Sequence, residues 1–262
     1  MKLTIKALSP ISHGAFKDGV DSGNISEFRR MPVLISNKSL LGEVPVISGN
    51  AIRGVLRRML TREYFAANDF SSKLTDKEHD RLYAILANGG ALGKDLEPKI
   101  NPEYIREVRG KLPILSILGA ACYRYMLNGN CNVGFAMMRC SELGTGDQSA
   151  DELVTEIGET RHIDRTVIDT DEQEIKPMPY ITEAVIPGAI FDGSITFSPQ
   201  ATEVEKAAIY HGIKLINYLG GKSARGYGRV EITADQELDD SAYMAVYDTA
   251  DIDFIKSFIA GT

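Results

Sequence analysis

Apolar and polar residues alternate along several short stretches of the chain, and this pattern predicts strands. Residues 2–8 place an apolar side chain at every second position, and residues 190–197 repeat the alternation. A period of two is typical of a strand with one buried face. Shorter apolar runs at 133–139 and 227–232 are expected to form two further strands.

Two helices are predicted between these strands. The first begins at Ser48, a residue type that caps helices, and apolar residues follow at helical spacing as far as Leu60. The second covers 202–219 and is expected to stop at the glycine pair that follows, because glycine commonly ends helices. Residues 113–127 form a further apolar stretch that looks helical.

The elements follow one another as strand, helix, strand, strand, helix, strand. This βαββαβ order predicts an α+β, ferredoxin-like or RRM-type core with both helices on one face of a four-stranded sheet. Two long polar stretches interrupt it, one at about 66–112 with short helical pieces and one at about 155–187. Long segments inside a compact domain are usually functional. We therefore expect a single domain over 1–262 with two insertions.

The composition permits a large core but gives no bulk positive charge. Apolar residues make up 44% of the chain, and 36 acidic residues against 29 basic ones give a formal net charge of −7. This excludes nucleic-acid binding through overall charge but not through a local basic track. No apolar run is long enough to span a membrane, and the first residues do not resemble a signal peptide. We expect a cytoplasmic protein.

The cysteines and histidines do not form a metal motif. Cys122, Cys131 and Cys140 contain no CxxC pair, and the four histidines are scattered. No GxGxxG follows a strand, and no phosphate-binding P-loop is present. We expect neither a metal nor a cofactor.

The segment between the second helix and the last strand combines glycine with positive charge. Residues 219–229 read LGGKSARGYGR, with four glycines and three basic residues. Glycine lets a backbone approach a ligand closely, and Lys222, Arg225 and Arg229 can supply charge to phosphates. An ordinary glycine-rich turn with solvated bases is the competing interpretation.

The start of the first helix is the second candidate site. A capped helix N-terminus presents free N–H groups and the positive end of the helix dipole to an anion. Arg53 and Arg57 lie one and two turns further on and would extend that attraction. A plain capped helix with an exposed polar face explains the same residues.

Together these motifs resemble those of the RAMP superfamily, the RRM-like proteins of CRISPR systems. The segment VPVISGNAIRGVLRRML (44–60) is similar to the family's IPGSSLKGKLR helix start, and LGGKSARGYGRVEI (219–232) to its glycine-rich loop. The segment ALSPISHG (7–14) resembles the end of its first strand. Their order looks like that of the backbone subunit, the Cas "seven" family, similar to type III or type IV effector backbone proteins.

The resemblance implies a subunit that binds guide RNA in antiviral defence. Copies would polymerise head-to-tail along crRNA and present it to complementary target RNA or DNA, together with other CRISPR effector subunits. The stretch at about 155–187 would be the thumb-like β-hairpin insertion, and 66–112 a helical insertion. The implied RNA contacts are Arg29, Arg30, Ser48, Gly49, Asn50, Arg53, Arg57, Arg161, His162, Arg165, Gly221, Lys222, Ser223 and Arg225. A solvated loop is the other interpretation of 161–165.

The resemblance also bears on cleavage. Family members that cut RNA carry an aspartate just before the Pro-Val strand in the early loop, and here Arg30 stands at that place. A cation cannot bind the metal or act as a base, but it can hold phosphate. We expect no cleavage activity. The alternatives are an endoribonuclease of the same superfamily using His13, Asp21 or His162, and an RRM-like structural module with no role in RNA binding.

Overall fold

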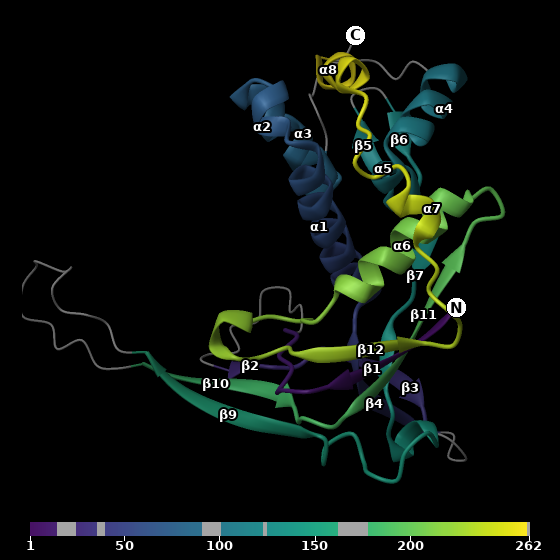
Figure 1. Ribbon diagram of the computed structural model, residues 1–262. Helices are drawn as coiled ribbons and strands as arrows, with labels where there is room; N and C mark the ends of the chain where they lie inside the picture. Colours follow the sequence, from purple (N-terminus) through teal and green to yellow (C-terminus); the bar gives the residue numbers. More distant parts are fainter. Residues whose placement is uncertain (15–24, 36–39, 91–100, 123–124, 162–177, 261–262) are drawn as a thin grey trace, which may run out of the picture.

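The fold is a mixed α+β arrangement built on one large sheet (Figure 1). The computed structural model describes residues 1–14, 25–35, 40–90, 101–122, 125–161 and 178–260. The strands of the large sheet follow the spatial order β12 (Val230–Ala234), β1 (Lys2–Ala7), β11 (Ile190–Phe197), β8 (Ala136–Met138), β4 (Leu41–Ile47) and β3 (Arg30–Leu34), and β7 (Cys131–Val133) also pairs with β11.

β1 lies second from the β12 edge of the sheet and pairs antiparallel with both β11 and β12. Ile5 lies opposite Phe191 on one side and Ile232 on the other. Alternate residues of β1 are buried, as the period of two predicts. The strands expected at 2–8 and 190–197 are confirmed, whereas the last strand begins at Val230, later than the sequence pattern indicates.

The strand expected at 133–139 is broken into two short pieces. β7 pairs with the C-terminal end of β11, and β8 pairs nearer its start. Between the two pieces the Gly134 amide donates a hydrogen bond to the Ser194 carbonyl. One long partner strand therefore holds both pieces in the same sheet.

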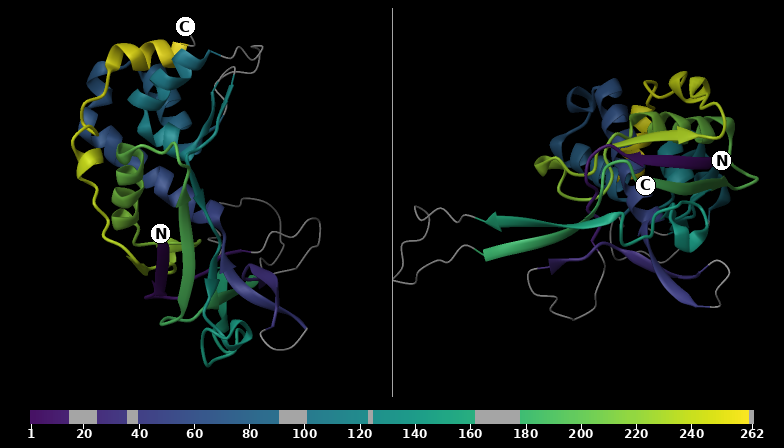
Figure 2. Two further views of the ribbon diagram at one scale, coloured as in Figure 1. Left: turned by 90° about the vertical axis from the view of Figure 1, so that its right-hand side faces the viewer. Right: turned by 90° about the horizontal axis from the view of Figure 1, so that it is seen from below.

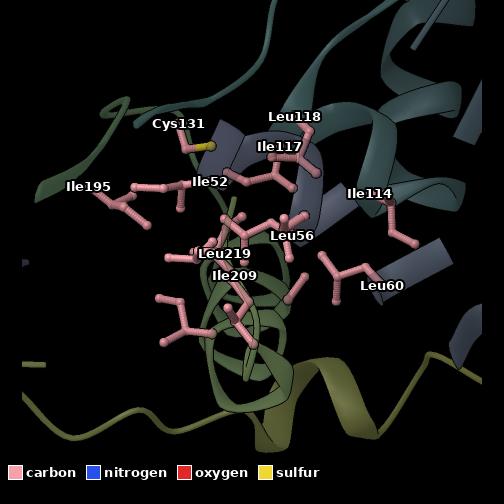
Figure 3. Close-up of a cluster of buried hydrophobic side chains, with 14 of the residues drawn as sticks. Ile52, Leu56, Leu60, Ile114, Ile117, Leu118, Cys131, Ile195, Ile209 and Leu219 are labelled. Atoms are coloured by element: carbon pink, nitrogen blue, oxygen red, sulfur yellow. The ribbon is translucent and has the colours of Figure 1, made fainter. Parts of the chain in front are cut away.

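Two helices, α1 (Gly49–Asn68) and α6 (Glu203–Leu215), lie on the same side of the sheet and pack against each other (Figure 1). Gly212 permits the close approach, because a Cβ there would lie 2.9 Å from Leu56 Cδ2. Figure 3 shows the buried cluster at this contact, with side chains from α1, α5, α6 and the neighbouring strands; the labelled residues include Ile52, Leu56, Leu60, Ile117, Ile209 and Leu219.

Further helices pack around α1 and α6 on the side away from the sheet (Figures 1 and 2). They are α2 (Phe70–Lys73), α3 (Asp76–Asn88), α4 (Pro102–Lys111), α5 (Pro113–Leu118), α7 (Ser241–Met244) and α8 (Ile252–Ala260). The C-terminal tail belongs to the core, since Tyr243 and Phe258 are fully buried. The Asn68 side chain fixes this tail to α1 by donating to the Tyr247 carbonyl and accepting from the Ala250 amide.

Two helix predictions are wrong in extent. The apolar stretch at 113–127 is helical only through α5, because Gly119 has a φ of +68° and turns the chain into the hairpin of β5 (Ala120–Cys122) and β6 (Tyr125–Leu127). The helix expected over 202–219 ends at Leu215, before the glycine pair. Residues 217–219 are extended there, with the Leu219 amide donating to the Gly228 carbonyl.

A separate antiparallel ribbon projects from the body of the molecule, as Figure 1 and the right-hand view of Figure 2 show. β9 (Val154–Arg161) pairs with β10 (Met178–Val185) over eight residue pairs, and the short strand β2 (Ile25–Ser26) runs parallel beside β10. At its base the Ile11 and Val185 backbones exchange hydrogen bonds, 3.0 and 2.9 Å long. The ribbon is thus attached to the sheet at the end of β1.

Candidate nucleic-acid interface

Segments that are far apart in the sequence meet just beyond the end of β1, at Ser12 and His13. The Gly221 amide donates to the Ser12 carbonyl at 2.7 Å, and the Ser48 amide donates to His13 Nε2 at 3.2 Å. The Arg29 amide donates to the His13 carbonyl at 2.7 Å. Two adjacent residues therefore bring together the glycine-rich loop, the start of α1 and the early loop, which are the three segments that the sequence singled out.

The His13 ring serves as a hydrogen-bond acceptor in this junction. Burial, with a further contribution from the positive charge of Arg29, lowers the pKa of His13 below its ordinary value. A neutral ring that accepts a hydrogen bond through Nε2 carries its own proton on Nδ1. The ring also packs edge-on against Phe28, with ring centres 6.1 Å apart. His13 therefore holds the junction together as a neutral side chain.

The glycines of the loop permit contacts within the chain. A Cβ at Gly220, where φ is +89°, would lie 2.4 Å from the Ser12 carbonyl oxygen. A Cβ at Gly228, where φ is +84°, would lie 2.3 Å from the Leu219 carbonyl oxygen. The sequence pattern predicted that the loop glycines let the backbone approach a ligand closely. At Gly220 and Gly228 the close approach is to the protein's own backbone.

We expect Gly220→Ala to destabilise the fold by about 2 kcal/mol or more, because an alanine there adds both a clash and an unfavourable φ. Gly221→Ala is the control: its φ is not positive, and its Cβ would lie 3.8 Å from the Ser12 oxygen, an ordinary contact. Urea unfolding followed by circular dichroism measures both variants. Equal stability of the two would contradict the packing at Ser12.

Lys222 connects the glycine-rich loop to the β9–β10 ribbon. Its Nζ donates to Thr182 Oγ1 and lies 4.6 Å from the centre of the Tyr180 ring and 5.9 Å from that of Tyr227. Such cation–π contacts stabilise a lysine by about 0.5–1 kcal/mol at exposed sites. The loop is thus held beside the ribbon, and the short 3₁₀ turn Ser223–Arg225 that follows Lys222 is exposed.

The start of α1 is built mainly by packing. Ser48 is buried and its Oγ accepts from the Ala51 amide at 3.2 Å, which is a regular helix cap. A Cβ at Gly49 would lie 2.1 Å from the Val133 carbonyl oxygen, so glycine is required for α1 to sit on β7. Asn50 is exposed at this end of the helix. Of the predicted contacts Ser48, Gly49 and Asn50, Asn50 alone presents an exposed side chain.

Arg30 is paired with carboxylates. Its Nη1 lies 2.7 Å from Asp151 Oδ1, and its Nη2 lies 3.7 Å from Glu183 Oε1 on β10. The same Glu183 accepts from the Phe28 amide at 2.8 Å. Arg30 therefore links the early loop to the ribbon, and its charge is balanced locally.

Arg57 is buried, with 6% of its surface exposed, and it binds backbone carbonyls. Its guanidinium donates to Leu86 O, Leu118 O and Gly119 O at 3.3, 2.8 and 2.5 Å. These carbonyls lie at the C-terminal ends of α3 and α5, where the helix dipoles favour a cation. Arg53 also donates to Leu118 O. This geometry gives Arg57 a structural role in place of the RNA contact that the sequence resemblance implies.

The electrostatic state of Arg57 agrees with this arrangement. Burial, with a smaller contribution from the nearby charge of Arg53, lowers the pKa of Arg57 to about 10. The guanidinium is therefore still charged at neutral pH. Two cations side by side are tolerated because the carbonyls at two helix ends face them.

Several predicted residues lie where the structure gives no side-chain contacts. Arg161 ends β9, but its side chain is outside the description, as are His162, Arg165 and Asp21 altogether. Thr182 and Tyr180, which hold Lys222, were missed by sequence reasoning. They lie in a polar stretch with no motif, and they come beside the loop because β10 is bonded to Ile11, the neighbour of the Ser12 that binds Gly221.

Among the described residues, no three or more His, Cys, Asp or Glu side chains are grouped so that they could hold a metal ion. Cys122, Cys131 and Cys140 are buried, and no disulfide joins them. Burial raises the pKa of Cys131 to about 11, so it remains a neutral thiol at neutral pH.

In the described part of the chain no helix combines the length and the apolar character needed to cross a membrane.

Comparison with known proteins gives one family and one shared fold. The model of the RAMP superfamily matches residues 4–231. A chain of a structure described as a Type IV-B CRISPR Complex is 19% identical, with a TM-score of 0.62, and the match covers 91% of this chain and 95% of that one. Csc2 of Thermofilum pendens, a crystal structure, is 18% identical with a TM-score of 0.45, covering 98% of this chain and 73% of that one. No curated protein matches.

Proposed function

We propose, because the chain belongs to the RAMP superfamily of CRISPR-associated proteins, that it is a backbone subunit of a CRISPR effector complex and binds guide RNA. Copies would assemble head-to-tail along crRNA, beside other effector subunits, and present the guide to complementary target RNA or DNA. The fold shared with a chain of the Type IV-B CRISPR Complex supports this proposal. In a guided system, base pairing reads the sequence and the protein holds the backbone.

We assign the core to the ferredoxin-like, RRM-type class. The order β12-β1-β11-β8 with α1 and α6 on one side supports this assignment, since a βαββαβ chain of this class places its last strand beside its first. β3 and β4 then extend the sheet at the β8 edge. The helices within about 66–112 and the β9–β10 ribbon within about 155–187 are the helical and thumb-like insertions of a single domain.

The observation that carries the proposal is the junction at Ser12 and His13. It places the exposed turn Ser223–Arg225 and the start of α1 on segments that are hydrogen-bonded to adjacent residues. An exposed basic turn and a helix N-terminus both suit phosphate groups. Such contacts carry no base information, so we expect the protein to bind guides of any sequence.

The junction also argues against the endoribonuclease alternative for His13. The Nε2 atom of that ring accepts a hydrogen bond from the Ser48 amide, so this atom is already engaged within the protein. Arg30, at the place of the family's cutting aspartate, is engaged with Asp151 and Glu183. Asp21 and His162 lie outside the described residues.

We expect the purified protein to carry RNA, and the loaded assembly to bind a complementary strand without cutting it when magnesium is added. The absorbance ratio and the size of extracted RNA measure loading, and end-labelled target strands measure cleavage. Absence of RNA binding at low salt would favour the structural-module alternative. Regularly spaced products that disappear in an Asp21→Ala variant would establish the nuclease instead.

A further inference from the structure

A second basic surface runs along α1, beyond the helix start. It is an open cleft of about 730 Å³ between the N-terminal half of α1, the C-terminal end of α3, the β5–β6 hairpin and β7. Its lining includes Asn50, which also belongs to the proposed interface, and Arg58, which is not among the RNA contacts that the sequence resemblance implies. A volume of this size falls in the range of pockets that hold small ligands, about 300–1,000 Å³.

The charged side chains among the described residues that line the cleft are all positive. Arg53, Arg57 and Arg58 line it, and none of the described lining residues is an aspartate or glutamate. Arg53 and Arg57 are fixed on carbonyl oxygens, so they supply a constant positive field from the floor of the cleft. A concave surface lined by one sign of charge concentrates ions of the opposite sign.

Arg58 differs from its two neighbours because its charge is exposed at the surface of the cleft. Within the described part of the chain no ion pair or hydrogen bond engages its guanidinium. It lies back over Gly54, where an added Cβ would come 3.4 Å from Arg58 Nη1. The third arginine is thus placed to contact a ligand that enters from the α1 start.

The rest of the lining matches the chemistry of a nucleobase. The exposed residues Asn88, Asn128 and Asn132 come from the end of α3, from the loop after β6 and from β7, and Met126 has 74% of its surface exposed. An amide side chain offers both donors and an acceptor, so it can bond to the edge of any base. A thioether can pack against a flat ring.

We propose that this cleft binds one nucleotide of single-stranded RNA, with Arg58 on its phosphate and the asparagine amides around its base. The inference rests on the proposed function, because the strand would reach the cleft by way of the α1 start. Asn50 lines the cleft at that end, so the two surfaces are continuous. Each copy would then contact RNA at the glycine-rich loop and again along α1.

The test compares Arg58→Gln with Arg62→Gln, an exposed arginine on the same helix that does not line the cleft. Anisotropy titrations with labelled single-stranded RNAs of unrelated sequence measure affinity at graded salt. We expect Arg58→Gln to weaken binding about 3- to 10-fold and to lower the salt slope by about 0.7, the value for one phosphate of a single strand. Arg62→Gln should bind as the parent protein does.

A second measurement locates the strand. RNA containing 4-thiouridine is crosslinked to the protein by light, and the attached peptide is mapped; we expect crosslinks within residues 126–132. Equal affinity of both variants together with absence of these crosslinks would overturn the cleft while leaving the proposed function intact. Failure of the parent protein to bind any RNA would overturn both. Self-association without RNA that Arg58→Gln weakens would assign the cleft to a neighbouring chain and contradict the inference.

Discussion

Replacing Lys222 and Arg225 together with alanine is expected to weaken RNA binding about 10- to 100-fold at low salt, because two phosphate contacts are lost. Arg225 is exposed on the turn Ser223–Arg225, and Lys222 holds that turn beside Thr182 and the Tyr180 ring. The double variant therefore removes two charges and one tether. The loss should be the same for RNAs of unrelated sequence, since phosphate contacts carry no base information.

Filter binding at graded salt measures this effect. The slope of log affinity against log salt should fall by about 1.4, twice the value for a single-strand phosphate. Lys77→Ala with Arg81→Ala is the matched control: both residues are exposed on α3, and the change in net charge is identical. A loss confined to one RNA sequence, or an equal loss in the control, would count against a phosphate-binding loop.

The fold was predictable where hydrophobic periodicity meets a clear boundary signal. β1 alternates strictly, and α1 begins at a serine cap, so both lie where the pattern places them. The prediction was wrong where an apolar run shows neither the period of a helix nor that of a strand. Residues 114–120 are buried, and only the contact of Gly119 with the Leu127 and Gly129 backbones decides that the chain turns back as a hairpin.

The candidate site was predictable in its segments but not in its roles. Composition and spacing single out the glycine-rich loop and the helix start, yet nothing in the sequence says that Ser12 and His13 join them. Arg30 could not be seen to pair with Asp151 and Glu183, because that contact spans three separate segments. Charge along a sequence reveals where cations occur, and tertiary contacts decide which of them are left for a ligand.

Arg57→Met should lower the free energy of unfolding by about 2–4 kcal/mol. A methionine retains much of the side chain's length but donates no hydrogen bond, so the carbonyls of Leu86, Leu118 and Gly119 would be left buried without the partner they now have. The neighbouring substitution Arg58→Met is the control, because that side chain is exposed and a surface change typically costs within about 0.5 kcal/mol.

Urea unfolding and RNA titration of the two variants separate structure from binding. If Arg57 is the structural cation, Arg57→Met loses stability, and under conditions where it is folded its RNA affinity changes less than that of Arg58→Met. The opposite pattern, full stability with weakened binding, would return Arg57 to the RNA contacts that the sequence resemblance implied. Arg57 and Arg58 are adjacent on one helix but differ in role. Arg57 faces the carbonyl ends of α3 and α5 and stabilises the fold, whereas Arg58 faces solvent and is placed to contact RNA.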